Sequence, residues 1–480
     1  MAIRTMKLRL VAFVVALAGC TFLSDVDDLD ATTPLLGYRV GGTNQGAVLA
    51  AYSTESLASG LASRIVFAGG PGSAHYVFGV WSGASVDLRR ILDGCEDGTC
   101  GPATGVAVTG LSNVDTTIDG GRRFSYTDCV LVGSAPPPGN PMDTGVLRVQ
   151  CEGEPSSTVT VDGPDGVRFG TEVAGLPAAL EDLGVALVGA PGDARIRVLG
   201  ADLNPRSLEQ PMDANLGTES RLGVRFAVAR EPQTVPGLRG DAAVFLAAAP
   251  GSARPEDGRV VAFGFGRGEL DDALTLVTLG CLAGVRVRAA AAPPDDGGSF
   301  ALGDLGPSAG LDVVIGDPMA GTVRRWSLSS FTGAAGCAAT DTSDDPAPAD
   351  MLTCPPPMGD VSCSSFGGSV AVGNFDGQGG GDLLVGAPSS TVEGEPGAGA
   401  AYVFAEGDAA RVATLLTAET TANGLFGEEV ASVESQLSGT IRDEAVVAAP
   451  GQSSVFVYLC TGLDGDDVGE GIPRCLPEGS

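Results

Sequence analysis

Few residue types in the sequence are suited to catalysis, although acidic residues are abundant. The 480 residues include one histidine, His75, against 59 aspartates and glutamates. A Ser-His-Asp or Cys-His arrangement would depend entirely on His75, because histidine is the proton acceptor in such sites. His75 lies within SAHYVFGVW, a run that suits a β-strand. We therefore expect His75 to be an ordinary strand residue.

Carboxylate pairs and tryptophans offer a second route to chemistry, the cleavage of glycosidic bonds. Two carboxyl groups can act as acid and base on a sugar, and an aromatic ring can stack against it. The 59 acidic residues provide too many pairs to single one out. Trp81 and Trp326 each lie in a predicted strand, where packing is the simpler role. The sequence thus predicts a protein that is not an enzyme.

The cysteines suggest disulfides and an oxidising compartment. Apart from Cys20, ten remain, and eight of them form close pairs in the sequence. Neighbour pairing is the simplest hypothesis, although spacing alone does not fix connectivity. A metal site is the alternative, but the sequence has no CxxC pair and no histidine cluster. The pairs are Cys95 with Cys100, Cys129 with Cys151, Cys354 with Cys363 and Cys460 with Cys475, which leaves Cys281 and Cys337.

The first twenty residues have the features of an export signal. Three basic residues precede an apolar stretch over 10–17 that is too short to span a bilayer. The stretch ends in Leu17-Ala18-Gly19-Cys20, which resembles a bacterial lipobox, although an ordinary signal peptide is the alternative. We expect a signal peptide over 1–19, lipidation of Cys20 and an acidic tether over 20–34. Thr21 in place of aspartate favours the outer membrane, on its periplasmic or cell-surface face.

A strand, a turn of small residues closed by proline and a second strand recur along the chain. The clearest copy is FGGSVAVGNFDGQGGGDLLVGAP (366–388), followed by AAYVF (400–404). Its apolar run Leu383-Leu384-Val385 is typical of a strand buried on both faces, and Pro388 ends that strand. The turn prolines, about 55 to 70 residues apart, are Pro71, Pro136, Pro191, Pro250, Pro318, Pro388 and Pro450.

Phe-Gly pairs stand upstream of several copies, at 169–170, 366–367 and 426–427, with Leu222-Gly223 as a variant. In these pairs and in the Gly-Ala-Pro turns the chain resembles the FG-GAP repeats of integrin α-subunits. The resemblance implies an all-β fold, a seven-bladed β-propeller of four-stranded antiparallel blades over residues 35–460. A short acidic tail, 461–480, would follow it.

A ring of blades also suits the size of the repeat. One small sheet cannot bury both faces alone, whereas sheets stacked in a ring bury each other. An open array of β-sandwiches is the alternative, but a sandwich needs roughly 100 residues per unit. We expect long loops over 82–127, 329–365 and 389–399 to carry binding, because strands are used for packing.

Integrin-type blades often carry a calcium loop before the buried strand, and two copies resemble it. The sixth places Asn374, Asp376, Gln378 and Asp382 at the ligand offsets, and the fifth places Asp304, Ser308 and Asp312 there. Oxygen atoms at alternate positions can converge on Ca²⁺ because the loop curls around the ion. Gln378 replaces an acid, and Gly306 offers no side-chain oxygen. Turns closed by local hydrogen bonds are the alternative.

Net charge and the resemblance together set the expected function. A formal charge of −31 repels phosphate backbones, so we expect no nucleic-acid partner. We expect a monomer that binds the membrane through its lipid and that binds or scaffolds a protein or glycan ligand at the cell envelope. The alternative is a carbohydrate-active enzyme with carboxylates in the central channel of the propeller.

Overall fold

A computed structural model describes the chain from Leu36 to Tyr458, with gaps in many connections. The described ranges are 36–39, 45–56, 60–69, 76–82, 85–92, 105–118, 122–134, 145–151, 159–162, 168–177, 180, 183–191, 195–200, 205–208, 222–249, 258–269, 273–288, 297–306, 310–331, 347–355, 361–375, 380–405, 414–416, 421–435 and 442–458. The predicted leader, Cys20, the tether and the acidic tail lie outside them, as does His75. In the described part, no helix is both long enough and apolar enough to cross a membrane.

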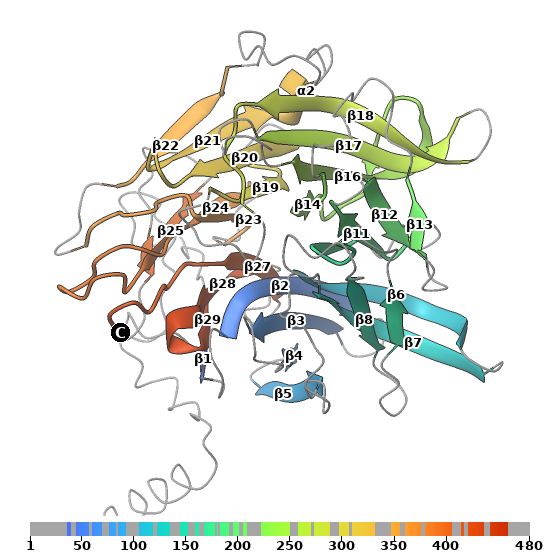
Figure 1. The fold of residues 1–480 in the computed structure, drawn as a ribbon, viewed down its shortest axis with the longest axis horizontal. Coiled ribbons are helices and arrows are strands. Elements are labelled where there is room, and N and C mark those ends of the chain that lie inside the picture. The colour runs from blue at the N-terminus through green and yellow to red at the C-terminus, as the bar shows by residue number, and fades with distance from the viewer. Residues whose placement is uncertain are drawn as a thin grey trace, which may run out of the picture.

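Within the described residues the strands form seven antiparallel sheets, which follow one another along the chain (Figure 1). Sheet 1 contains β2 (Gln45–Ser56), β3 (Gly60–Gly69), β4 (Tyr76–Ser82) and β5 (Ser85–Leu92). Sheet 2 contains β6 (Gly105–Ile118), β7 (Arg122–Ser134), β8 (Val146–Cys151) and β9 (Val159–Asp162). Sheet 3 contains β10 (Val173–Gly175), β11 (Ala186–Ala190), β12 (Arg195–Leu199) and β13 (Pro205–Ser207).

Sheet 4 departs from the expected four strands, because the short β15 (Gln233–Thr234) pairs with β16 as a fifth. Its other strands are β14 (Phe226–Val228), β16 (Leu238–Ala249), β17 (Arg259–Gly268) and β18 (Leu274–Ala283). Sheet 5 contains β19 (Phe300–Gly303), β20 (Asp312–Asp317), β21 (Thr322–Ser327) and β22 (Asp350–Thr353), with the short helix α2 (Leu328–Phe331) after β21. Sheet 6 contains β23 (Ser369–Gly373), β24 (Asp382–Ala387), β25 (Ala400–Phe404) and β26 (Thr414–Leu416).

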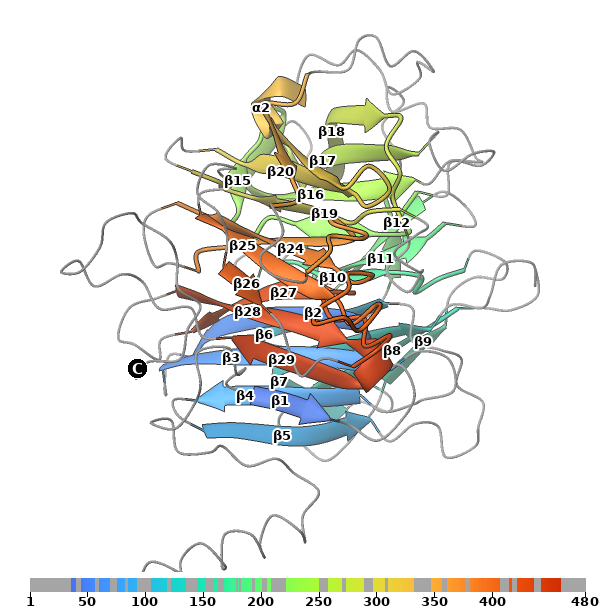
Figure 2. The same cartoon turned by 90° about the vertical axis from the view of Figure 1, so that its left-hand side faces the viewer.

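Sheet 7 combines strands from both ends of the described chain. Its strands β27 (Val430–Ser435), β28 (Arg442–Ala449) and β29 (Ser454–Tyr458) are joined by β1 (Leu36–Arg39), and the single-turn helix η8 (Pro450–Gln452) lies between β28 and β29. Strand β1 pairs with β29 in antiparallel register, Leu36 opposite Val457 (Figure 2). The repeat pattern did not predict this pairing, because it joins residues that are more than 400 positions apart.

One edge strand of each sheet, which we call the inner strand, lies nearest the common centre of the sheets in Figure 1. It is the first strand of sheets 1 to 6 and β27 in sheet 7. Neighbouring inner strands are in contact in circular order: β2 with β6, β6 with β10, β10 with β14, β14 with β19, β19 with β23, β23 with β27, and β27 with β2. Among the described side chains of sheets 3 to 7, each core cluster correspondingly belongs to two successive sheets. Leu187 and Ile196 of sheet 3, for example, pack with Phe245 and Phe263 of sheet 4.

The strands of the sixth copy are those expected from its sequence. Leu383, Leu384 and Val385 are at most 1% exposed in β24, as a strand buried on both faces requires. Trp326 lies in β21 and is 3% exposed, which fits a packing role. The segment 82–127 is not one long loop, since it holds β5, β6 and the start of β7; apolar and β-branched residues there form strands. The segment 329–365 likewise holds the end of α2 and all of β22.

The Phe-Gly and Gly-Ala-Pro residues meet at the seams between neighbouring sheets. Gly427 donates its N–H to the carbonyl of Ala448 in its own sheet, at 2.9 Å. Its own carbonyl oxygen lies against sheet 6, where a Cβ on Gly386 would sit 2.1 Å from it. The φ of Gly427 is +89°, in the left-handed region that glycine tolerates. Similar close approaches join Gly133 to Gly170, Gly189 to Gly223 and Gly316 to Gly367.

In two sheets whose successor brings no Phe-Gly pair, alanine stands in place of the turn glycine. Ala248 in sheet 4 and Ala448 in sheet 7 accept the same hydrogen bond, from Gly223 and Gly427. Sheets 5 and 1, which follow them, have no Phe-Gly before their inner strands. A Cβ is therefore accommodated where no neighbouring carbonyl approaches.

Candidate functional site

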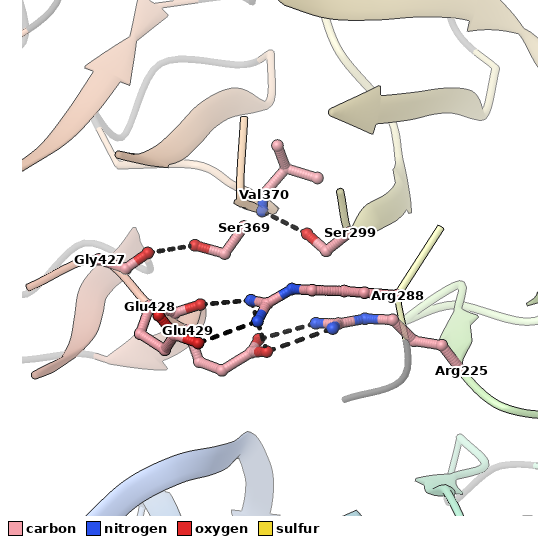
Figure 3. A network of polar contacts seen from close by, with 8 residues as sticks. All are labelled: Arg225, Arg288, Ser299, Ser369, Val370, Gly427, Glu428 and Glu429. Carbon is pink, nitrogen blue, oxygen red and sulfur yellow. Dashed lines mark hydrogen bonds and ion pairs between the residues drawn. The ribbon is translucent and has the colours of Figure 1, made fainter. Parts of the chain in front are cut away.

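Polar side chains from several sheets gather where the inner strands begin (Figure 3). Residues at corresponding positions just before or at the start of an inner strand are Glu172, Arg225, Ser299, Ser369 and Glu429. Glu172, Arg225, Ser369 and Glu429 each come two residues after the glycine at the seam of their sheet. Because the inner strands surround a common centre, these positions face one another from five sheets.

An ion pair crosses from sheet 4 to sheet 7 at this end of the inner strands. Arg225 donates to both carboxylate oxygens of Glu429, at 3.2 Å and 2.7 Å (Figure 3). The side chains are 12% and 6% exposed. A bidentate guanidinium–carboxylate pair fixes geometry as well as charge. Arg225 thus ties together two sheets that are three places apart in the circular order.

Arg288, in the connection between sheets 4 and 5, reaches the same carboxylates. Its side chain is fully buried; Nη1 donates to Glu428 Oε1 at 3.0 Å and Nη2 to Glu429 Oε1 at 2.9 Å. Nη2 also donates to the backbone carbonyl of Glu428. We call Glu172, Arg225, Arg288, Glu428 and Glu429 the central cluster.

Two serines join the adjacent seams beside the central cluster. Ser369 donates its hydroxyl to the carbonyl of Gly427, and Ser299 accepts the backbone N–H of Val370, each at 2.7 Å (Figure 3). Both serines are completely buried. Sheets 5, 6 and 7 are therefore linked by polar contacts as well as by apolar packing.

Glu172 of sheet 3 differs from Glu428 and Glu429 in that it forms no ion pair with a described residue. It is 8% exposed, and its Oε2, like that of Glu428, has no hydrogen-bond partner among the described residues. Burial raises the pKa of Glu172 well above its ordinary value; nearby Arg225 opposes this shift and nearby Glu429 adds to it. A carboxyl in such surroundings favours the protonated, neutral form.

A second polar group lies where the inner strands end. Arg230 follows β14 and contacts both carboxylate oxygens of Asp443, at 2.7 Å and 2.8 Å. It also donates to the hydroxyl of Ser432 in β27, at 2.6 Å. The backbone N–H of Asn374, which follows β23, donates to Asp443 Oδ2 at 2.6 Å. Arginines of sheet 4 thus pair with acids of sheet 7 at both ends of the inner strands.

The proposed calcium loop of the sixth copy is described only in part, because Asp376 and Gln378 lie outside the described residues. Asp382 is completely buried, and its Oδ2 accepts the N–H of Phe375 at 2.8 Å. Asn374 Oδ1 is buried without a hydrogen-bond partner in the described part of the chain. These two residues approach the loop from either end, as ligands at the first and last offsets would.

In the fifth copy an arginine lies beside the proposed final ligand. Arg325 Nη2 contacts Asp312 Oδ2 at 2.9 Å and also donates to the carbonyl of Leu305. Burial raises the pKa of Asp312 even though Arg325 opposes that shift. Asp304 is described, whereas Ser308 is not. Arg325 thus already brings a positive charge to this loop, which favours a turn closed by local contacts over a calcium site. Over the described residues, no group of three or more metal-ligating side chains is found in either loop or elsewhere.

Three described cysteines, in or near sheets 4 to 6, form disulfide bonds. Cys354 and Cys363, neighbours in the sequence, form a disulfide. Cys281 is also disulfide-bonded. Cys129 and Cys151 lie directly opposite each other on β7 and β8. The other predicted disulfide residues, which lie outside the described residues, are Cys95, Cys100, Cys337, Cys460 and Cys475.

Sequence reasoning missed the central cluster. Its signal is positional: Glu172, Arg225 and Glu429 each stand three residues after the Phe or Leu of a Phe-Gly or Leu-Gly pair. A charged residue just before an apolar strand usually indicates a side chain that is exposed to solvent. Only closure of the sheets around a centre buries these side chains against one another.

Comparison with known proteins gives no family for the chain. No protein-family model matches the sequence, and no curated protein matches it either. Among solved structures, virginiamycin B lyase from Staphylococcus aureus has a TM-score of 0.42 at 10% identity, over 88% of this chain and 97% of that one. The Aleuria aurantia lectin, a six-bladed β-propeller, has a TM-score of 0.35 at 10% identity, over 92% and 100%. A putative 6-phosphogluconolactonase from Bacteroides uniformis has 0.38 at 12%, over 84% and 95%. Similarities this weak decide neither the number of blades nor the function.

Proposed function

We propose that the protein is a seven-bladed β-propeller of the FG-GAP type that binds or scaffolds a protein or glycan ligand and does not catalyse a reaction. The circular order of contacts between inner strands supports seven blades. The pairing of β1 with β29 supports closure, because a strand from the start of the chain completes the last sheet. Glycine contacts at four seams support the FG-GAP resemblance.

The observation that carries the binding role is the state of the central carboxylates. Glu428 and Glu429 are held by Arg225 and Arg288, and Asp443 is held by Arg230. A carboxylate fixed in a buried ion pair has a poor geometry for accepting a proton from a substrate, since its oxygens already accept hydrogen bonds. These three carboxylates therefore serve to hold sheets together, and recognition falls to the connections between strands. Glu172, which has no ion pair among the described residues, is the carboxyl that the enzyme alternative would use.

The described connection 389–399 illustrates such a recognition surface. Its tip, from Glu393 to Pro396, is exposed, while Val392 and Ala398 on either side are 3% exposed and anchor it to the sheet. Hydrogen bonds between Val392 and Glu395 in both directions hold the tip as a compact turn. An ordered acidic loop of this kind suits a ligand with basic or hydroxyl groups.

The experiment is a comparison of binding and turnover with the full chain in native envelopes. Crosslinking followed by affinity purification should recover a defined protein or glycan, and recovery should fall when Glu393 and Glu395 are both replaced by glutamine. Glycan substrates should remain intact. Robust cleavage that disappears with one substitution, Glu172→Gln being the first to examine, would instead favour the carbohydrate-active enzyme.

We also propose that Cys20 carries lipid and places the protein on the outer membrane, at its periplasmic or cell-surface face. Support comes from the order of basic, apolar and small residues before that cysteine. The disulfides at Cys354–Cys363 and at Cys281 fit an oxidising compartment outside the cytoplasm.

A further inference from the structure

Two carboxyl oxygens of the central cluster, Glu172 Oε2 and Glu428 Oε2, are buried without a hydrogen-bond partner among the described residues. Glu428 is ion-paired to Arg288 through its other oxygen, whereas Glu172 forms no ion pair with any described residue. It lies immediately before β10, and the backbone on either side is fixed. Thr171 donates its hydroxyl to the carbonyl of Arg168 at 2.7 Å, and the Glu172 carbonyl accepts the N–H of Gly189 at 2.8 Å. The side chain is 8% exposed. Glu172 is therefore held in a buried position without a donor for that oxygen.

The charge balance of the central cluster leaves one carboxyl in excess. Arg225 uses both terminal nitrogens on Glu429, and Arg288 uses its own on Glu428 and Glu429. Three carboxylates against two guanidinium groups would leave one uncompensated negative charge if all were ionised. A buried charge without a partner is costly, and a buried carboxyl relieves that cost by taking a proton.

The groups that face Glu172 come from several elements. Strand β10 packs against β6, β7, β11 and β14. Arg225 faces it from the start of β14, and Glu429 faces it from the start of β27 with Glu428 and Arg288 behind. Strand β11, Ala186–Ala190, has no titratable side chain. The titratable residues of β6 and β7, whose side chains lie outside the described part, are Asp115, Arg122, Arg123, Tyr126, Asp128 and Cys129.

We propose that Glu172 is protonated at neutral pH in the folded protein and that this proton makes the stability of the ring depend on pH. Burial, which raises the pKa of Glu172 well above 4.5, agrees with this arrangement. In the unfolded chain Glu172 loses its proton near that ordinary value. Between the two pKa values the folded state holds one proton more than the unfolded state, so stability falls as pH rises. Below the ordinary pKa, Glu172 is protonated in both the folded and the unfolded chain, so this fall in stability disappears.

The test compares unfolding of the full chain and of Glu172→Gln across the pH range from below 4.5 to alkaline values. Glutamine has the shape of a protonated glutamate and cannot ionise. We expect the variant to melt a few degrees higher than wild type at neutral or alkaline pH and no higher at acidic pH. Its Tm should therefore decline less with rising pH. Glu269→Gln, at an exposed position beside β17, is the matched control and should melt as wild type does at every pH.

An infrared measurement on the folded protein keeps the proposal testable even if the variant folds poorly. Wild-type protein at neutral pH should show the carbonyl band of a protonated carboxyl, and the band should persist in Glu269→Gln and vanish in Glu172→Gln. Absence of that band in wild type would overturn the proposal. So would stabilisation of wild type by added Na⁺, K⁺ or Ca²⁺ that Glu172→Gln abolishes, because a cation would then replace the proton.

Discussion

Single arginine side chains near the common centre of the sheets make contacts between residues far apart in the sequence. Arg225 and Arg230 stand at the two ends of the three-residue strand β14, and each reaches an acid of sheet 7, more than 200 positions later. Over the described side chains of sheets 3 to 7, each core cluster is drawn from two successive sheets. The arginines add direct links between sheets that do not pack on each other.

The buried pair of Arg225 and Glu429 should therefore be costly to break. Removing one partner of a buried ion pair leaves the other charge without compensation, and such losses amount to about 3–5 kcal/mol. Arg225→Ala should lower the free energy of unfolding by an amount in that range, measured by denaturant unfolding at neutral pH. Arg230→Ala is the comparison: its partner Asp443 is 4% exposed, but Asp443 keeps the N–H of Asn374, and water can replace a guanidinium that is 47% exposed, so the loss should be smaller. Equal losses in the two variants would show that burial does not decide the strength of these links.

Repeated elements explain why the Phe-Gly and Gly-Ala-Pro residues recur together. The glycine of one sheet and the turn glycine of the preceding sheet form a single contact, in which neither position has room for a Cβ. The sequence allowed the strands and their turns to be predicted, because apolar runs and prolines are local signals. It did not reveal that the two glycines touch, since they belong to different copies.

Gly386→Ala should accordingly destabilise the seam between sheets 6 and 7. The new Cβ would lie 2.1 Å from the carbonyl oxygen of Gly427 and 2.2 Å from the hydroxyl of Ser369, so backbone must shift. Overpacking of this kind costs about 1–3 kcal/mol. Ala248→Gly in sheet 4 removes a Cβ at a corresponding position that has no Phe-Gly neighbour, and it should cost at most about 1 kcal/mol through backbone entropy. Thermal unfolding of both variants measures the difference. A Gly386→Ala protein with the Tm of wild type would contradict the close contact between Gly386 and Gly427.

The sixth-copy loop is the element in which we predict calcium. Asn374 Oδ1 lies buried without a described partner, and Asp382 closes the loop from the other side. Millimolar Ca²⁺ should raise the Tm of the wild-type protein, because an ion that binds only the folded state stabilises it. Asp376→Ala should abolish the shift. Asp304→Ala, in the fifth copy where Arg325 already pairs with Asp312, should leave it intact. A Tm that Ca²⁺ does not change would refute a site in this loop.

At the scale of the whole molecule, the sequence predicted a β-rich body, whereas the details of its closure and its centre had no local signal. The described strands lie between Leu36 and Tyr458. The fifth strand of sheet 4 and the pairing of β1 with β29 had no local signal. The central cluster could not be predicted either, because Glu172, Arg225 and Glu429 read as solvent-facing charges until the sheets surround a common centre.

The proposed attachment to a membrane also belongs to this scale, because it would depend on Cys20, which precedes the first described strand. β1 begins at Leu36, so 15 residues separate Cys20 from the body of strands. A thioether-linked lipid with more than one acyl chain would hold the protein stably, whereas one chain alone binds marginally. Metabolic labelling with an alkyne fatty acid should mark the wild-type protein in the outer-membrane fraction. Cys20→Ala should lose the label, while Cys354→Ala should keep it, since that cysteine is in a disulfide. If Cys20→Ala retained the label, lipidation at Cys20 would be refuted, whereas the proposed arrangement of the sheets would still stand.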